Sequence, residues 1–178
     1  MKQMSVAIIG SRRITEKQFD YLVKVGEAFA RRGWVVRTGC ADGADHAGMT
    51  GTRNVNPDLL HLFLPWSTYN KGYQEETDTV TIYDEKQHQE WAKSVSIFHP
   101  APDKLKQGAF KLMARNYGII MHGTPVDVVV AFPISDTDVG GTGQGMRLAK
   151  EYEIPLYTVC NRADRLALKQ FIESIPIR

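Results

Sequence analysis

The sequence predicts an α/β fold whose mostly parallel sheet is covered by helices on both faces. Short apolar segments with little polar alternation, typical of strands buried on both faces, alternate along the chain with amphipathic segments of helical period. Two strand-like segments, at 4–9 and 126–132, lead to glycine-rich turns at 10–13 and 140–145. A glycine turn between a strand and a helix brings free backbone N–H groups close to an anion, so the same pattern predicts phosphate binding.

The first strand and helix have clear boundaries. Residues 4–9 form the strand, because they are apolar with little alternation. Thr15 and Gln18 have the spacing of a capping box, which predicts a helix from about Glu16. Gly33 is expected to end that helix, since a glycine is common just after a helical segment.

The same alternation predicts the other elements. Strands are expected at 34–38, 59–64, 126–132 and 154–159, and helices from about 44, at 104–122, at 141–152 and at 162–174. Residues 66–104 are harder to interpret, and the prolines of His99-Pro100-Ala101-Pro102 exclude a helix there. We expect one domain over 1–178, with 66–104 an insertion packed near one edge of the sheet.

Composition restricts the function only broadly. The chain has 178 residues, 43% of them hydrophobic and 24% charged, which is ordinary for a soluble globular protein. The net charge of +2 is too balanced to indicate nucleic-acid binding by itself. No apolar run approaches the roughly 20 residues of a membrane span, and no signal peptide is seen, so we expect a cytoplasmic protein. Two cysteines make no metal set, and neither metal nor cofactor is expected.

The turn Gly10-Ser11-Arg12 stands at the carboxyl end of the first strand, where ligands bind in open α/β sheets. A serine hydroxyl can donate to phosphate, and an arginine can bind it with two hydrogen bonds. The turn is equally interpreted as a tight connection with a surface arginine.

Two further motifs accompany it. Thr38, Gly39, Gly43 and Asp45 belong to a turn that opens a helix, where Asp45 either stabilises the helix start or accepts a hydrogen bond from a ribose or base. Arg115-Asn116 lies in a long helix that leads to the strongest strand. Arg115 either is solvated or reaches the same sheet edge, and an asparagine inside a helix hints at a specific hydrogen bond.

The segment 140–145 is the most specific local signal, with four glycines in six residues. It fits a phosphate loop at a helix N-terminus, although no Gly-Lys-Ser/Thr follows. The alternative is a flexible turn. The predicted ligand-binding residues here are Gly140, Gly141, Thr142, Gly143 and Gln144.

These four motifs, in this order, resemble the SLOG superfamily, which includes DprA-type DNA-processing proteins and LOG-type phosphoribohydrolases. The resemblance covers about residues 4–159, although we can place no counterpart of 70–104 in that superfamily. Pro65-Trp66, together with Arg115-Asn116, also resembles a small stand-alone branch of it. It implies a Rossmann-like three-layer sandwich that binds nucleotides, and often a homo-oligomer, for which the apolar face of 105–121 is a candidate.

The sequence departs from the LOG-type pattern. Those hydrolases carry a Pro-Gly-Gly-x-Gly-Thr-x-x-Glu loop whose glutamate takes part in cleavage. Here the proline is absent before Gly140, Gln144 replaces the threonine, and Met146-Arg147 occupies the region of the glutamate. Glycoside cleavage needs a carboxylate near the bond, so no catalytic residue is predicted. The carboxylates that remain as possible substitutes are Asp42, Asp45, Asp136 and Asp138.

The sequence therefore predicts a protein that binds a phosphorylated nucleotide or a nucleotide-derived small molecule, such as an ADP-ribose-like signal, as a sensor, carrier or sequestering protein without catalysis. Two alternatives stay open. One is a DprA-like recombination mediator that binds single-stranded DNA through the same arginines. Its additional groups would be Arg13, Arg37, Trp66, Tyr69 and Tyr73. The other is a phosphoribohydrolase of nucleoside monophosphates.

Overall fold

The computed structural model describes residues 2–133 and 140–177. Within these residues, six parallel strands form one sheet in the order β4-β3-β2-β1-β5-β6. The strands are β1 (Ser5–Gly10), β2 (Val35–Thr38), β3 (Leu60–Leu64), β4 (Thr79–Ile82), β5 (Val128–Phe132) and β6 (Leu156–Thr158). The helices are α1 (Glu16–Ala30), α2 (Ala44–Val55), α3 (Gln89–Phe98), α4 (Gln107–Met121), α5 (Gly140–Glu151) and α6 (Arg162–Glu173).

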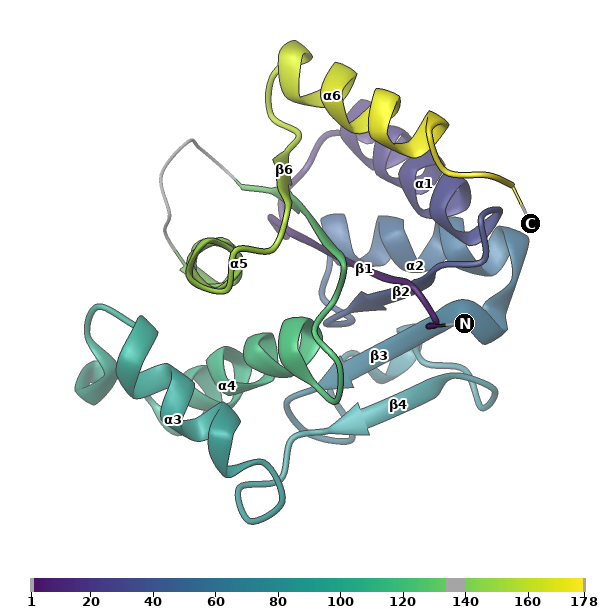
Figure 1. Cartoon of the computed structure of the whole chain (residues 1–178). Coiled ribbons are helices and arrows are strands. Elements are labelled where there is room, and N and C mark those ends of the chain that lie inside the picture. Colours follow the sequence, from purple (N-terminus) through teal and green to yellow (C-terminus); the bar gives the residue numbers. More distant parts are fainter. Residues whose placement is uncertain (1, 134–139, 178) are drawn as a thin grey trace.

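The helices cover both faces of the sheet and make three layers (Figure 1). Val6 and Ile8 of β1 face a layer made by α1, α2 and α6. Ala7 and Ile9, the alternate residues, face the layer made by α3, α4 and α5. Because β1 is buried on both faces, its sequence is apolar without alternation. The predicted α/β, Rossmann-like fold with a parallel sheet is confirmed.

The strand order reverses beside β1. The chain proceeds outward through β2, β3 and β4, then returns to place β5 on the other side of β1, with Gly10 opposite Phe132. Connections on the two sides of such a point diverge and leave a crevice at the carboxyl ends of the strands. The topology therefore assigns the candidate site to the ends of β1 and β5.

Local signals placed most elements within a few residues. Thr15 accepts a hydrogen bond from the Gln18 N–H, and the Gln18 side chain accepts one from the Thr15 N–H, so the predicted capping box is confirmed. The helix ends at Ala30, and Gly33 follows in the turn with φ +71°. Every helix in the described part of the chain is too short or too polar to cross a lipid bilayer.

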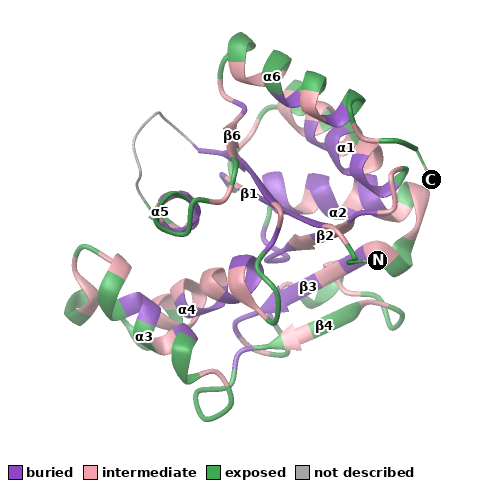
Figure 2. Ribbon diagram, viewed as in Figure 1, coloured by how far each residue is buried: buried purple, intermediate pink, exposed green. Residues whose placement is uncertain are grey.

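The segment 66–104 contains two elements that the sequence analysis missed, the edge strand β4 and the helix α3. Most of β4 is exposed (Figure 2), so its sequence lacks the apolar run that marks the central strands. An edge strand that pairs with one neighbour and packs on little of the core need not show an apolar pattern in its sequence. The expectation that this segment lies at one edge of the sheet agrees with the position of β4.

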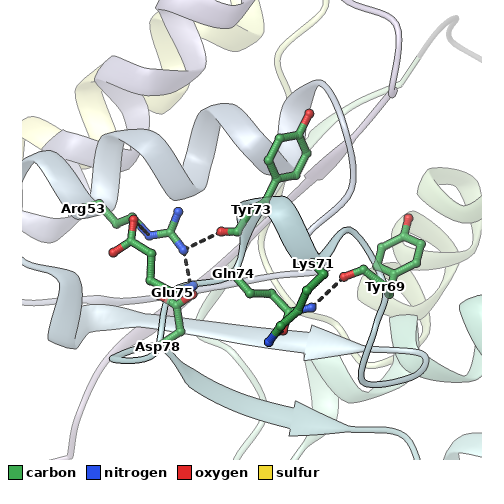
Figure 3. A network of polar contacts seen from close by, with 7 residues as sticks. All are labelled: Arg53, Tyr69, Lys71, Tyr73, Gln74, Glu75 and Asp78. Carbon is green, nitrogen blue, oxygen red and sulfur yellow. Dashed lines mark hydrogen bonds and ion pairs between the residues drawn. The ribbon is translucent and has the colours of Figure 1, made fainter.

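A network of polar contacts connects residues 69–78 of this segment to Arg53 of α2 (Figure 3). Arg53 Nη2 donates to the Tyr73 carbonyl oxygen at 2.8 Å and to Asp78 Oδ2 at 2.6 Å. Arg53 Nε lies 3.5 Å from a Glu75 carboxylate oxygen. Gln74 Nε2 donates to the Tyr69 carbonyl oxygen at 2.7 Å. One arginine of α2 thus fixes the connection between β3 and β4.

Candidate ligand-binding site at the ends of β1 and β5

A cavity of about 400 Å³ lies at this point of strand reversal, within the usual size range of small-molecule sites. Nine of the predicted site residues line it: Gly10, Ser11, Arg12, Asp45, Arg115, Asn116, Gly140, Gly141 and Thr142. Five lie outside the lining: Thr38, Gly39, Gly43, Gly143 and Gln144. Motifs spread over more than 130 positions of the sequence therefore meet at one place.

The turn after β1 uses most of its own polar groups internally. The Ser11 N–H donates to the Phe132 carbonyl oxygen at 2.7 Å, and Ser11 Oγ accepts from the Arg13 N–H at 3.0 Å. These bonds shape the turn and leave the serine buried. The side chains of Arg12 and Arg13 are exposed and have no ion pair in the described structure. The two arginines are therefore the groups at this turn best placed to meet an anion.

Two predicted glycines allow this turn to pack against the start of α2. The Ala44 N–H donates to the Ser11 carbonyl oxygen at 3.0 Å. Gly43 has φ +74°, and a Cβ there would lie 2.3 Å from that same carbonyl oxygen. A Cβ on Gly10 would lie 2.6 Å from the Ala44 Cβ. These glycines are needed for close packing between backbone segments, and so they set the shape of the site.

Asp45 and Arg115 hold the turn at 39–41 from two sides. Asp45 Oδ2 accepts hydrogen bonds from the N–H groups of Gly39 at 3.0 Å and Ala41 at 3.3 Å. Arg115 Nη1 donates to the Gly39 carbonyl oxygen and, at 3.1 Å, to the Phe63 carbonyl oxygen. Arg115 is only 4% exposed. The alternative in which it is a solvated helix arginine is wrong.

Burial shifts both of these charged groups. It raises the pKa of Asp45, and the positive charge of Arg115 opposes that shift. Burial likewise lowers the pKa of Arg115, opposed by the negative charge of Asp45. Each charge thus compensates part of the cost of burying the other. Cys40, in the same turn, has its pKa raised to about 11, chiefly by burial, so its thiol stays protonated at neutral pH and is a poor nucleophile.

The glycine-rich segment is the start of α5 rather than a loop before it. The helix begins at Gly140, and the preceding residues 134–139 lie outside the described structure. Gly140, Gly141 and Thr142 present the first helical turn to the cavity, where backbone N–H groups have no helical acceptor. The first turn therefore offers donors and a positive helix end to an anion.

The later residues of this segment serve packing. Gln144 is fully buried, and its Nε2 donates to the Met113 carbonyl oxygen at 3.1 Å. A Cβ on Gly145 would lie 2.4 Å from Ile9 Cδ1, so this glycine lets α5 approach β1. Asn116 Nδ2 donates to the Gly141 carbonyl oxygen at 3.2 Å, which confirms that this asparagine makes a specific hydrogen bond. These contacts fix the first turn of α5 against α4.

Sequence reasoning missed the apolar wall of the cavity. It is formed on α4 by Ala109, Leu112, Met113 and Ile119. The sequence analysis expected an apolar face over 105–121 and offered it as an oligomer interface, but a sequence does not distinguish such a face from one that borders a cavity. A cavity lined by both apolar side chains and arginines suits a ligand with a flat heterocycle and an anionic group.

Most groups suggested for DNA binding are engaged elsewhere. Tyr69 is buried beneath the Arg115 guanidinium, 5.4 Å from ring centre to Cζ. Tyr73 stacks on His46 with ring centres 4.0 Å apart, and Trp66 packs edge-on against Tyr69. Arg37 Nη1 donates to the His122 carbonyl oxygen, away from the cavity. Of the additional groups, Arg13 alone lines the described cavity.

The carboxylates that could replace the LOG-type glutamate are placed as follows. Asp42 accepts a hydrogen bond from the Tyr73 hydroxyl at 2.7 Å, and Asp45 lines the cavity but is bonded to two N–H groups. Asp136 and Asp138 lie outside the described residues. Within 2–133 and 140–177, no three His, Cys, Asp or Glu side chains are grouped to hold a metal ion.

The sequence and the fold are similar to known proteins. The family model for DNA recombination-mediator protein A matches residues 1–60, which include two of the four motifs. The fold is similar to that of DNA processing protein A from Helicobacter pylori, a single-stranded DNA-binding protein, with a TM-score of 0.60 and 18% identity over 96% of this chain and 79% of that chain. No curated protein sequence matches the chain.

Two molybdenum-cofactor proteins have similar folds. The molybdenum cofactor binding protein from Rippkaea orientalis has a TM-score of 0.57 and 15% identity, over 98% of this chain and 88% of that chain. The molybdenum cofactor carrier protein from Chlamydomonas reinhardtii has a TM-score of 0.57 and 14% identity, over 98% of this chain and 87% of that chain. Identities this low show a shared fold alone. The resemblance to DprA-like, Rossmann-type proteins is confirmed.

Proposed function

Because the chain has the Rossmann-type fold of the SLOG and DprA-like proteins, we propose that it binds a phosphorylated nucleotide or nucleotide-derived small molecule, of the ADP-ribose type, at the ends of β1 and β5. The protein would act as a sensor, a carrier or a sequestering protein. The observation that supports this most is the cavity itself, which combines exposed arginines, a helix N-terminus and an apolar wall.

Each part of the cavity suits one part of such a ligand. The phosphate would meet Arg12 and the first turn of α5, where charge-assisted hydrogen bonds and the helix dipole favour an anion. The heterocycle would lie against Leu112 and Met113 of α4. The carboxylate of Asp45, which lines the cavity, would accept a hydrogen bond from a sugar hydroxyl.

The proposal includes binding without catalysis. Asp45 is the one carboxylate that lines the described part of the cavity, and two N–H groups already bond to it. Glycoside hydrolysis generally uses two carboxyl groups placed on opposite sides of the bond. A retained, unaltered ligand is therefore expected.

Ligand binding can be tested with a panel of AMP, ADP, ADP-ribose and the molybdenum cofactor, measured by calorimetry and thermal unfolding. A ligand at about 100 times its Kd should stabilise the protein by about 2.7 kcal/mol. Arg12→Ala should weaken binding at least about tenfold, because a hydrogen bond to a charged group is lost. Arg31→Ala removes an exposed arginine at the far end of α1 and serves as the control.

If no member of the panel binds, or if Arg12→Ala and Arg31→Ala behave alike, the proposed site is not the ligand site. Release of a free base during incubation would instead support the phosphoribohydrolase.

Single-stranded DNA is the second candidate ligand. It is favoured by the match of residues 1–60 to the recombination-mediator family and by the exposed Arg12 and Arg13. Binding of oligo-dT should weaken with salt, with a slope of about −0.7 in log K against log salt for each phosphate contacted. A steep slope that Arg12→Ala and Arg13→Ala each reduce would favour DNA, whereas weak salt dependence and tight nucleotide binding would favour the small molecule.

A further inference from the structure

A second cavity, of about 570 Å³, lies between α1 and α6. These helices belong to the layer on the opposite face of the sheet from α4 and α5. The second cavity shares no lining residue with the first. We refer to it as the α1–α6 groove, and none of the roles proposed above involves it.

The groove is strongly basic. Among the described residues, Glu173 is the one acidic residue that lines it. Five cationic side chains line it as well: Lys24, Arg32, Arg162, Arg165 and Lys169. Arg32 is used structurally, since Nε donates to the Ile172 carbonyl oxygen at 2.6 Å. Lys169 lies 3.7 Å from the Glu173 carboxylate, with both side chains mostly exposed. Lys24 and Arg162 are exposed and have no ion pair within the described chain.

The floor of the groove is apolar. It is made by the buried Val25 of α1 and by Leu168 and Ile172 of α6. Leu166, which also lines the groove, is 54% exposed. A small anion confined to the cavity would leave this leucine in water, whereas a longer amphipathic segment would cover it. The combination of apolar floor and cationic rim matches an acidic segment with apolar anchors.

We propose that the α1–α6 groove is a docking site for an acidic amphipathic helix of a partner protein. Apolar side chains at helical spacing would contact Leu166 and the floor, and flanking carboxylates would pair with Lys24 and Arg162. Nucleic acid fits less well, because the ring that a base would stack on, Tyr21, is already covered by Arg165 at 5.9 Å from the ring centre.

A second copy of this chain also fits less well. The most acidic stretch of the sequence is 75–85, which contains strand β4 and no α-helix, and three of its five carboxylates have partners. Glu75 and Asp78 pair with Arg53, and Asp84 Oδ1 accepts hydrogen bonds from the N–H groups of Lys86 and Gln87. We therefore expect the acidic helix to come from a different protein.

The test uses the whole chain and a fluorescent synthetic peptide of about 15 residues, long enough to form a helix. Its sequence carries leucines at helical spacing and glutamates between them. Anisotropy should show binding that weakens severalfold as salt rises from about 50 to 300 mM, because exposed charges are screened. The double variant Lys24→Glu with Arg162→Glu should lose at least about tenfold in affinity. The double variant Lys86→Glu with Lys93→Glu, two exposed changes outside the groove, is the charge-matched control and should change affinity less than about twofold.

Two further probes separate the alternatives. Leu166→Ser should weaken the peptide while thermal unfolding stays unchanged, because this side chain is exposed. A peptide with glutamine in place of glutamate should bind more weakly than the acidic one. The proposal is overturned if no binding is seen at about 1 mM peptide, if the double variant binds as the wild type does, or if oligo-dT displaces the peptide from the groove.

Discussion

At the scale of single residues, the buried Arg115 has the largest expected effect on the site. Its donors reach carbonyl oxygens of Gly39 and Phe63, on two different segments. It also compensates the buried charge of Asp45. Removing it would leave two carbonyl oxygens without this donor and the buried Asp45 carboxylate without the positive charge that compensates it.

We expect Arg115→Met to lower the free energy of unfolding by about 3–5 kcal/mol, because an uncompensated charge stays buried. Adding Asp45→Asn should restore part of that loss, since the buried charge is then removed as well. Urea unfolding of both variants measures this. A loss below about 1 kcal/mol for Arg115→Met would show that the turn does not depend on this arginine.

Gly43 offers a second prediction at this scale. Gly43→Ala should destabilise the protein by at least about 2 kcal/mol, because its φ of +74° and the Ser11 carbonyl oxygen at 2.3 Å both oppose a Cβ. Gly72→Ala is the matched control, since nothing lies within 4 Å of its added Cβ. Comparing their thermal unfolding tests the idea, and equal effects of the two changes would refute it.

At the scale of elements, β4 and its preceding connection depend on α2 through the Arg53 network (Figure 3). The Asp78 side chain is fully buried, and Arg53 Nη2 is its ion-pair partner at 2.6 Å. In the described sheet, β3 is the one strand that pairs with β4. The Arg53 side chain of α2 therefore provides an additional attachment for the segment that leads into this edge strand.

Arg53→Met should lower the free energy of unfolding by about 3 kcal/mol, because the Asp78 carboxylate remains buried without its ion-pair partner. Hydrogen exchange should accelerate most in 66–82 and least in β1 and β5. Lys86→Ala, which removes an exposed side chain of 66–104 outside the network, is the control. Uniform acceleration over the whole sheet would contradict a local role for the network.

Acid is expected to weaken the packing of β3 and β4. Burial, and the charges of Arg37 and His122, lower the pKa of His61 from 6.5 to about 4. His61 Nε2 lies 2.8 Å from Thr81 Oγ1 of β4. The unfolded chain therefore binds more protons between these values, so stability falls as pH drops from about 6.5 toward 4.

His61→Gln should reduce that loss of stability while keeping a polar partner for Thr81. Urea unfolding of both proteins at several pH values between 7.5 and 4.5 measures the difference. The raised pKa of Asp45 acts with the opposite sign, but it is common to both proteins. Parallel pH profiles for the variant and the wild type would exclude His61 as the cause.

At the scale of the whole molecule, the sheet joins two hydrophobic layers, and the three tryptophans report on separate regions. Trp34 lies in the core cluster of α1 and α6, Trp91 in that of α3 and α4, and Trp66 packs on a third cluster near β3. If 1–178 is one domain, as the sequence predicts, these regions unfold together.

Three variants that each retain one tryptophan, with phenylalanine at the other two positions, should therefore show coincident urea transitions. Far-UV circular dichroism should follow the same curve. An earlier transition for the Trp66 and Trp91 reporters, which both lie in 66–104, than for the Trp34 reporter would mark that segment as a separate folding unit. Assembly into a homo-oligomer through 105–121 and a cytoplasmic location remain predictions that sedimentation and fractionation can test.

The sequence alone determined the alternation of strands and helices, the capping box at Thr15 and the order of the four motifs. These follow from local chemistry: hydrophobic period, side-chain caps and glycine turns act within a few residues along the chain. The same local patterns predicted a site at the ends of β1 and β5, where the structure has a cavity.

The tertiary structure decided what each motif residue does. Gly43 and Gly145 must be glycines because a Cβ at either position would collide with atoms of residues distant in sequence. The side chains of Gln144 and Arg115 donate hydrogen bonds to carbonyl oxygens of other elements. The exposed strand β4 likewise became recognisable only beside β3. These roles depend on close packing between segments brought together by the strand order, and a one-dimensional pattern does not contain those distances.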